Sequence, residues 1–133
     1  MDPKDFLTTY LDDFSDLVKP DEEIVHKLAE IADLLKAVHS NGNKTLIFGN
    51  GGSAATASHF SVDLTKNAKL RCINFNEADL ITCFANDYGF ERWVAKAVEF
   101  YGDKGDQLIV ISSSGNSENM LKGVKAAQNK NFR

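Results

Sequence analysis

Residues 108–117 read Leu-Ile-Val-Ile-Ser-Ser-Ser-Gly-Asn-Ser, an apolar run followed directly by hydroxyl side chains and a glycine. The apolar run is typical of a buried strand in a parallel sheet. Apolar residues recur after it at helical spacing, at Met120, Leu121, Val124 and Ala127, so a helix is predicted to follow. Hydroxyl donors, backbone N–H groups and the positive end of a helix dipole therefore meet in one loop. Such a loop favours an anion site that carries no charge of its own.

A second loop of this kind lies earlier in the chain. Thr45-Leu46-Ile47-Phe48 is predicted to be a short buried strand, and Gly49-Asn50-Gly51-Gly52-Ser53 follows it before a helix from about residue 54 to 66. Two polar loops at strand ends indicate one crevice for a phosphorylated ligand.

The rest of the pattern alternates between helix and strand. Helices are predicted over 4–18, from Pro20 to about residue 40, over 78–85, 93–101 and 116–129, and strands over 70–75 and 107–111. Alternation of this kind predicts an α/β fold, in which a parallel sheet has helices on both faces. Ligands in such sheets bind at the carboxyl ends of the strands, where both polar loops are expected.

Composition excludes several classes of function. The chain has 133 residues, of which 43% are hydrophobic and 26% charged, and its net charge is -4. Its basic residues are scattered, so no direct nucleic-acid binding is expected. It has no apolar run of membrane-spanning length and no signal peptide, which predicts a cytoplasmic protein without membrane contact. Cys72 and Cys83 are both predicted to be small buried hydrophobes.

Three segments together resemble the sugar isomerase (SIS) domain family, and within it the phosphoheptose isomerase branch. They are residues 49–55 with His59-Phe60, then residues 85–90 (Ala-Asn-Asp-Tyr-Gly-Phe), then residues 111–117. The resemblance covers essentially the whole chain. It implies a flavodoxin-like three-layer αβα sandwich, a homotetramer, and a phosphosugar site shared between subunits. It also implies interconversion of sedoheptulose 7-phosphate and a heptose 7-phosphate, whose product feeds synthesis of bacterial surface polysaccharide (lipopolysaccharide) heptose.

The sequence departs from that family in two places. Asp63 stands where the family has a glutamate that serves as base and metal ligand. The family chain also continues through two further strands and a C-terminal helix with a glutamine and a histidine, whereas this chain stops at Arg133. We therefore expect residues 1–133 to be one SIS domain that is incomplete at its C-terminus, and the alternative is a naturally abbreviated protein. Residues 1–42 would form a helical pair for oligomer contacts, and 43–133 the α/β core.

The candidate substrate-binding residues come from three loops. They are Asn50, Gly51, Gly52, Ser53, Asn86, Asp87, Ser112, Ser113, Ser114 and Ser117. The serines are predicted to bind phosphate, and the alternative is a serine-rich helix cap. The glycines would let the backbone approach a ligand or would only form a tight turn. For Asn86 and Asp87 the resemblance implies contacts with sugar hydroxyls, and the alternative is turn chemistry.

His59 and Asp63 are four residues apart and so share one face of the predicted helix. Spacing alone leaves open a metal site, a proton-transfer pair and an ordinary local helical pair. The resemblance implies that His59 is a zinc ligand and that Asp63 is a second ligand and the catalytic base. Aspartate is one methylene shorter than glutamate, and a displacement of about 1 Å can cost about a hundredfold in rate. This leaves three interpretations of Asp63: a weakened base, a base for a different substrate geometry, or a residue that is not a base.

Two functions remain open at this point. The first is the phosphosugar isomerase. The alternative is a non-catalytic SIS protein that binds a phosphosugar as a regulator or binds a partner protein, as one relative binds a bacterial replication initiator. A nucleotide-binding domain is a weaker reading, because the loops lack the lysine and the third glycine that such sites use. The two leading helices are predicted to pack against another subunit, and packing on their own sheet is the alternative.

Overall fold

The structure is a computed structural model, and it describes residues 2–133. The chain divides between Leu34 and Leu35 into two compact units. This boundary lies inside a helix, ahead of the division that the sequence suggested between residues 42 and 43. Each unit is described below by itself.

The first unit consists of α1 (Pro3–Leu17) and most of α2 (Glu22–Ser40). Asp21 starts α2, because its carboxylate accepts a hydrogen bond of 2.8 Å from the backbone N–H of Ile24. The helix therefore begins after Pro20 and not at it, as the sequence had suggested. The large apolar side chains of this unit are exposed: Phe6, Leu7, Tyr10, Leu11, Phe14, Leu17, Val18, Ile24, Val25, Leu28 and Ile31.

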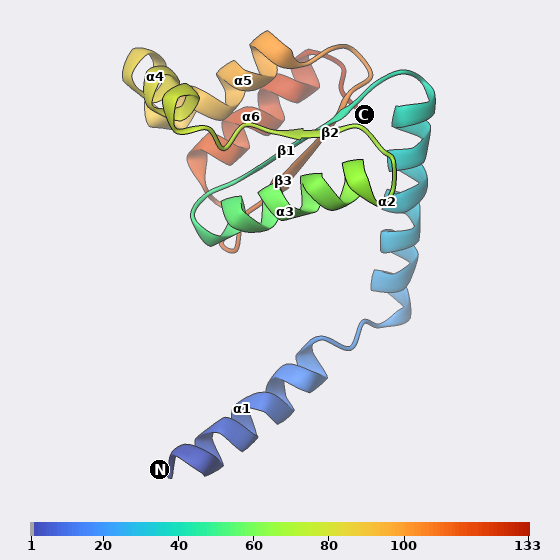
Figure 1. The fold of residues 1–133 in the computed structure, drawn as a ribbon, viewed down its shortest axis with the longest axis vertical. Helices are drawn as coiled ribbons and strands as arrows, with labels where there is room; N and C mark the ends of the chain where they lie inside the picture. The colour runs from blue at the N-terminus through green and yellow to red at the C-terminus, as the bar shows by residue number, and fades with distance from the viewer. Residues whose placement is uncertain (1) are drawn as a thin grey trace. The chain divides into compact units, whose positions relative to one another are not determined.

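A parallel sheet of three strands forms the centre of the second unit (Figure 1). The strands are β1 (Thr45–Gly49), β2 (Cys72–Asn74) and β3 (Gln107–Ile111), in the order β2-β1-β3. Every residue of the central strand β1 is buried. This explains its continuous apolar pattern, since both of its faces are covered.

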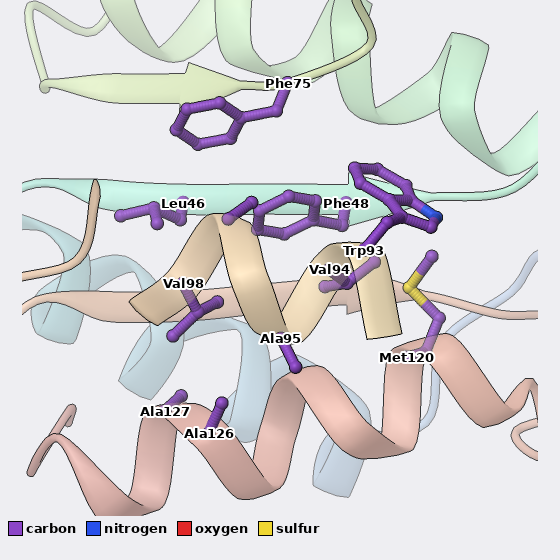
Figure 2. Packing of buried hydrophobic residues seen from close by; sticks show 11 residues of the cluster. Leu46, Phe48, Phe75, Trp93, Val94, Ala95, Val98, Met120, Ala126 and Ala127 are labelled. Carbon is purple, nitrogen blue, oxygen red and sulfur yellow. The ribbon is translucent and has the colours of Figure 1, made fainter. Parts of the chain in front are cut away.

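Helices cover the two faces of the sheet separately. Figure 1 shows α3 (Gly52–Lys66) on one face and α4 (Ala78–Tyr88), α5 (Trp93–Tyr101) and α6 (Glu118–Asn129) on the other. Alternate residues of β1 point to opposite faces, as a strand requires. Leu46 and Phe48 belong to a cluster that includes Trp93 and Met120, and Figure 2 shows Phe48 beside Trp93. Ile47 belongs to a second cluster, which includes Ala57 of α3. The predicted α/β fold is confirmed.

The amino ends of β1 and β3 are joined by a buried ion pair. Lys44 Nζ lies 2.6 Å from Asp106 Oδ2, and the side chain of Asp106 is 1% exposed. The same carboxylate accepts hydrogen bonds from the backbone N–H groups of Lys44 and Asp103, at 3.0 and 2.8 Å. A buried carboxylate needs such partners, because burial without them would cost several kcal/mol (roughly 3 to 5).

Several predicted boundaries are wrong by a few residues. The helix α3 begins at Gly52 instead of 54, α6 begins at Glu118 instead of 116, and β2 is shorter than the predicted 70–75. The helix α4 continues through Asn86 and Asp87 to Tyr88, where we had predicted a break. Gly89, with a φ of 90°, provides the break, and a short 3-10 helix (Phe90–Arg92) leads into α5.

Cys72 is buried as predicted, but Cys83 is exposed. Its apolar neighbours in the sequence suggested burial, yet its position on α4 directs it to the surface. Among residues 2–133, no helix has the length and apolar character needed to span a membrane.

Candidate functional site

The two polar loops begin side by side at one edge of the sheet. β1 and β3 are neighbours, and Gly49 of β1 pairs with Ile111 of β3 at their carboxyl ends. The chain leaves β1 toward β2 on one side and later returns to place β3 on the other side. This reversal of strand order is where open α/β sheets form ligand crevices. The strand order therefore agrees with the ligand crevice that the sequence predicted between the two loops.

A reciprocal pair of side-chain amides joins the two loops. Asn50 Nδ2 donates to Asn119 Oδ1 at 3.0 Å, and Asn119 Nδ2 donates to Asn50 Oδ1 at 2.8 Å. Asn119 is 3% exposed. Sequence reasoning missed Asn119, because its partner is 69 residues away and only the strand order brings the two together.

Three of the predicted serine hydroxyls form a cluster. Ser112 Oγ lies 3.2 Å from Ser117 Oγ and 3.5 Å from Ser114 Oγ, while Ser113 is exposed beside them. The backbone N–H of Asn116 donates to Ser114 Oγ at 3.2 Å, which holds the loop in a tight turn. Hydroxyls that are within hydrogen-bond distance of one another can rotate to donate to a common acceptor. The cluster can therefore serve as a small set of anion donors.

Both helices that follow these loops have N-termini without a side-chain cap. Ser117 is the N-cap residue of α6 and Gly51 that of α3, and within residues 2–133 neither makes a side-chain capping hydrogen bond. The cap alternative for Ser117 is therefore not supported, since its hydroxyl pairs with Ser112. The N–H groups of Ser53, Ala54 and Met120 have partners within the chain. Within residues 2–133, this leaves the first N–H of α3, on Gly52, and the first two of α6 to attract an anion together with the helix dipoles.

The glycines of residues 49–53 have distinct structural roles. A Cβ on Gly49 would lie 2.4 Å from the backbone oxygen of Ser53, so only glycine allows the loop to fold back this closely. Gly51 has a φ of 54°, and Gly52 has open space around its Cα. Ser53 is half-buried, and its backbone N–H donates to the Asn50 carbonyl at 3.0 Å. The loop is thus a tight turn, and its exposed side is formed by Gly51 and Gly52.

His59 and Asp63 lie together on α3, with 3.6 Å between Nε2 and Oδ2. Their side chains are 80% and 48% exposed, because the face of α3 that packs on the sheet is formed by Ala57, Ser61 and Leu64. Asp63 also accepts a hydrogen bond of 3.0 Å from Asn67 Nδ2. The pair predicted from spacing exists, but it faces away from the sheet.

The donor chemistry of this pair suits zinc, yet two donors are fewer than the three protein ligands of a catalytic zinc site. Across residues 2–133, no group of three or more His, Cys, Asp or Glu side chains could hold a metal ion. His59 and Asp63 therefore do not form a zinc site by themselves.

Asn86 and Asp87 are exposed in the last turn of α4. Asn86 Nδ2 donates to Asp87 Oδ1 at 2.9 Å, and the Cys83 thiol lies 3.8 Å from Asp87 Oδ2. Over residues 2–133, no hydrogen bond joins these two side chains to the loops after β1 and β3. The turn alternative for them is wrong, because both are helical.

Two surface hollows lie away from the predicted residues. One of about 300 Å³ is formed by α5 and α6 near Arg92 and Lys125, and one of about 290 Å³ by α3 and β2 near Ser61 and Cys72. Neither is lined by a residue of the two polar loops. The hollow between α5 and α6 is lined by charged side chains, among them Arg92, Glu99 and Lys122, but it includes no residue that follows β1 or β3. The candidate site therefore lies at the two loops, at the carboxyl ends of the strands.

Comparison with known proteins agrees with this geometry. The SIS domain family matches residues 9–133 of the chain. The chain belongs to the SIS domain family. Its similarity within that family is to the phosphoheptose isomerase branch, which confirms the resemblance drawn from the three motifs.

The most similar relatives of this SIS chain include two bacterial phosphoheptose isomerases. The one from Fusobacterium nucleatum is 40% identical over 129 residues, which cover 92% of this chain and 66% of the relative. The one from Helicobacter pylori (strain P12) is 42% identical over 118 residues, covering 84% and 62%. The chain spans about 60 to 66% of the length of the first curated relatives that it matches.

Solved structures give the same result for the fold of this SIS chain. A phosphoheptose isomerase from Neisseria gonorrhoeae is 32% identical with a TM-score of 0.83, over 96% of this chain and 71% of that one. A phosphoheptose isomerase from Francisella tularensis is 29% identical with a TM-score of 0.86, over 100% and 73%. The flavodoxin-like αβα arrangement expected from the resemblance is therefore confirmed.

Proposed function

We propose that the protein containing this chain is a phosphosugar isomerase that interconverts sedoheptulose 7-phosphate and a heptose 7-phosphate. The observation that carries the proposal is the convergence of the two polar loops at the point where the strand order reverses. The names of the relatives support the choice of sugar, since those at about 40% identity are called phosphoheptose isomerases. The product would supply heptose for surface polysaccharide, in the cytoplasm, where the two free thiols of the chain would stay reduced.

In this proposal the sugar phosphate binds between the loops. The proposed phosphate donors are the hydroxyls of Ser112, Ser114 and Ser117, together with the backbone N–H of Gly52 at the start of α3 and those of Glu118 and Asn119 at the start of α6. Each hydrogen bond to a charged oxygen contributes about 1.5 to 3 kcal/mol. Binding energy from this non-reacting end of the substrate positions the carbonyl end. Ser113, Asn50, Gly51, Gly52 and Ser53 complete the proposed pocket, and Asn86 and Asp87 are proposed to contact sugar hydroxyls.

Asp63 is the proposed base. Its carboxylate removes the proton from the hydroxyl-bearing carbon next to the carbonyl and returns it to the former carbonyl carbon. An enediol forms in between, because the carbonyl oxygen takes up a proton, and the neighbouring hydroxyl then releases one to make the new carbonyl. The overall reaction moves two hydrogens within the substrate and consumes nothing. A base positioned in this way contributes about 10² to 10⁴ in rate.

The exposure of Asp63 and His59 bears on the assembly. A base that faces bulk water cannot keep water from the enediol, so another protein surface must cover this face of α3. We propose that a second subunit does so in a homotetramer, with the apolar residues of α1 and α2 providing subunit contacts.

Zinc binding by the assembled protein stays a prediction, in which His59 and Asp63 would supply two of the ligands. Zinc content of the assembled protein, measured before dialysis against a chelator and again after zinc is added back, tests this prediction.

The non-catalytic alternative is not favoured, because the relatives are named as enzymes. The test is a coupled assay of the natural full-length protein with sedoheptulose 7-phosphate, with and without added zinc. The assay should show turnover. If the wild-type protein binds the sugar phosphate in calorimetry but does not convert it, the isomerase proposal is wrong.

The role of Asp63 is tested with Asp63→Asn. We expect kcat to fall by at least about 100-fold, because the amide cannot accept the proton, while the Kd for the sugar phosphate changes little. Asp79→Asn is the matched control, since Asp79 is an exposed carboxylate on α4. Equal turnover of Asp63→Asn and the wild type would show that another group is the base.

A further inference from the structure

We propose that Asn119 is a positioning residue, which holds Asn50 and the loop of residues 49–53 in register with the serine cluster. The inference deepens the proposed function, on which its catalytic part rests. It concerns a residue that sequence reasoning did not select, and which is buried below the loops.

The side-chain amide of Asn119 uses its oxygen and one of its two N–H groups in hydrogen bonds. Its amide exchanges two hydrogen bonds with Asn50, at 3.0 and 2.8 Å, and Oδ1 also accepts from the backbone N–H of Met120 at 3.1 Å. The reciprocal pair uses the carbonyl oxygen and one N–H of each amide. One N–H of Asn50 therefore remains for a ligand, in an orientation that Asn119 sets.

These contacts are the tether between the loops. The sheet joins the bases of the two loops, where Gly49 pairs with Ile111. Beyond that pairing, and within residues 2–133, the two amide hydrogen bonds are the ones that connect residues 49–53 with residues 112–119. The tethered loop contains three glycines, which leave its backbone flexible unless something holds it. The tether therefore fixes the distance between the donors at the start of α3 and those of the serine cluster.

Stability alone does not explain an amide at this position. A hydrogen bond between two buried neutral amides contributes only modestly to stability, and replacement of both partners by apolar groups can be nearly neutral. Alignment of donors on one phosphate is more sensitive, since a misplacement of about 1 Å can cost about 10²-fold in rate. We therefore expect changes at Asn119 to affect ligand binding and turnover beyond their effect on folding.

The test uses Asn119→Asp in the natural full-length protein. A carboxylate has the shape of the amide but cannot donate to Asn50 Oδ1, whereas the protonated acid can donate and accept as the amide does. At neutral pH we expect amide hydrogen exchange at Ser53 and Ala54, whose N–H groups bond within the loop, to accelerate about tenfold or more. Relative to wild type at the same pH, the acceleration should shrink as the pH falls and the new carboxyl is protonated.

Turnover gives the second readout. We expect kcat/KM for sedoheptulose 7-phosphate to fall about 10- to 100-fold in Asn119→Asp, more than the change in melting temperature explains. Asn129→Asp is the matched control, because it makes the same chemical change on an exposed residue of the same helix. Asn119→Ser is the second variant, since it adds no charge and its side chain is too short to reach Asn50.

Each outcome decides part of the proposal. Unchanged exchange at Ser53 and Ala54 in both Asn119 variants would overturn the tether. Faster exchange with an unchanged kcat/KM would overturn the role in positioning for catalysis. A wild-type protein that converts no sugar phosphate would overturn the proposed function, and the exchange measurements would still decide whether Asn119 holds the loop.

Discussion

Ser112 is the central hydroxyl of its loop, because its Oγ is within hydrogen-bond distance of both Ser114 and Ser117. Substitution Ser112→Ala removes one donor and leaves the other two without their common neighbour. We expect the Kd for sedoheptulose 7-phosphate to rise about 10- to 100-fold, which corresponds to a hydrogen bond with a charged group. Isothermal titration calorimetry measures the change.

Ser40→Ala is the control for Ser112→Ala, since Ser40 is exposed at the end of α2. The two variants should differ in Kd and agree in melting temperature to within a few degrees. Equal affinities would show that the phosphate binds elsewhere.

At the residue scale, sequence reasoning succeeded where chemistry is local. The hydroxyl run of residues 112–117 clusters as expected, and His59 and Asp63 meet across one helical turn. It failed for Cys83 and for the helical state of Asn86 and Asp87. Asn and Asp favour turns only weakly, and packing of α4 overrides that preference until Gly89.

At the scale of elements, the turn from β1 into α3 depends on Gly49. A methyl group there would approach backbone atoms of Ser53 that cannot move independently of α3. We expect Gly49→Ala to destabilise the fold by about 1 to 3 kcal/mol, the usual cost of overpacking. Urea unfolding monitored by circular dichroism measures the difference.

Gly52→Ala is the matched comparison for Gly49→Ala. Gly52 is the first residue of α3, and a Cβ there would meet no atom within 4 Å. Its replacement should change the free energy of unfolding by at most about 1 kcal/mol, in the stabilising direction. If both variants were equally stable, the close approach at Gly49 would not constrain the fold.

The ion pair below β1 and β3 makes stability depend on pH. Burial alone would raise the pKa of Asp106, but hydrogen bonds from Lys44 and from backbone N–H groups outweigh it and hold that pKa below the ordinary 3.8. In acid, the carboxyl of Asp106 therefore binds more protons in the unfolded chain than in the folded one. The contribution of Asp106 to the free energy of unfolding is present above pH 3.8 and is lost as the pH falls through the pKa of the folded protein. Burial alone would lower the pKa of Lys44, but hydrogen bonds to Asp103 and Asp106 raise that pKa above 10.5. The contribution of Lys44 to the free energy of unfolding is therefore lost as the pH rises through the higher pKa of the folded protein.

We expect Asp106→Asn to lower the free energy of unfolding at neutral pH by about 3 to 5 kcal/mol, because it leaves the Lys44 charge poorly paired. The variant should also lose part of the wild-type decline in stability between about pH 5 and about pH 2. Asp103→Asn is the control, since Asp103 pairs with the same lysine but its side chain is 78% exposed. Its cost should be about 0 to 1 kcal/mol. If Asp106→Asn and Asp103→Asn lowered the free energy of unfolding by similar amounts, the greater importance of the buried carboxylate of Asp106 would be contradicted.

At the scale of the whole molecule, the apolar stripe of the first unit is the strongest sign of assembly. The α1 helix has no buried residue, and its side chains Phe6, Tyr10 and Phe14 form a row of rings spaced 6.3 and 6.4 Å apart. Exposed apolar stripes of this kind mark protein interfaces. The proposed homotetramer would bury this stripe.

The double variant Leu7→Glu/Leu11→Glu tests the assembly. We expect the full-length protein to sediment as a larger oligomer and the variant as smaller species, because charge in a buried interface is costly. Thr9→Glu is the control, because Thr9 is exposed on the side of α1 that lies opposite Leu7 and Leu11, and it should keep the wild-type mass. An unchanged mass for the double variant, measured by analytical ultracentrifugation, would contradict the role of α1 in assembly.

The sequence by itself determined what depends on neighbours along the chain. The apolar period of two or of 3.6 residues fixed the number and order of the strands and helices. The hydroxyl and glycine loops could be placed at the ends of β1 and β3 for the same reason. Tertiary structure alone decided which distant residues meet and which side chains are buried, because both depend on which strands become neighbours. Placing β3 beside β1 brings Asn50 to Asn119, and packing of α3 through Ala57 and Leu64 turns His59 and Asp63 away from the sheet. Burial of Asp106 opposite Lys44 follows from the same pairing, since no local pattern in the sequence distinguishes this carboxylate from its exposed neighbour Asp103.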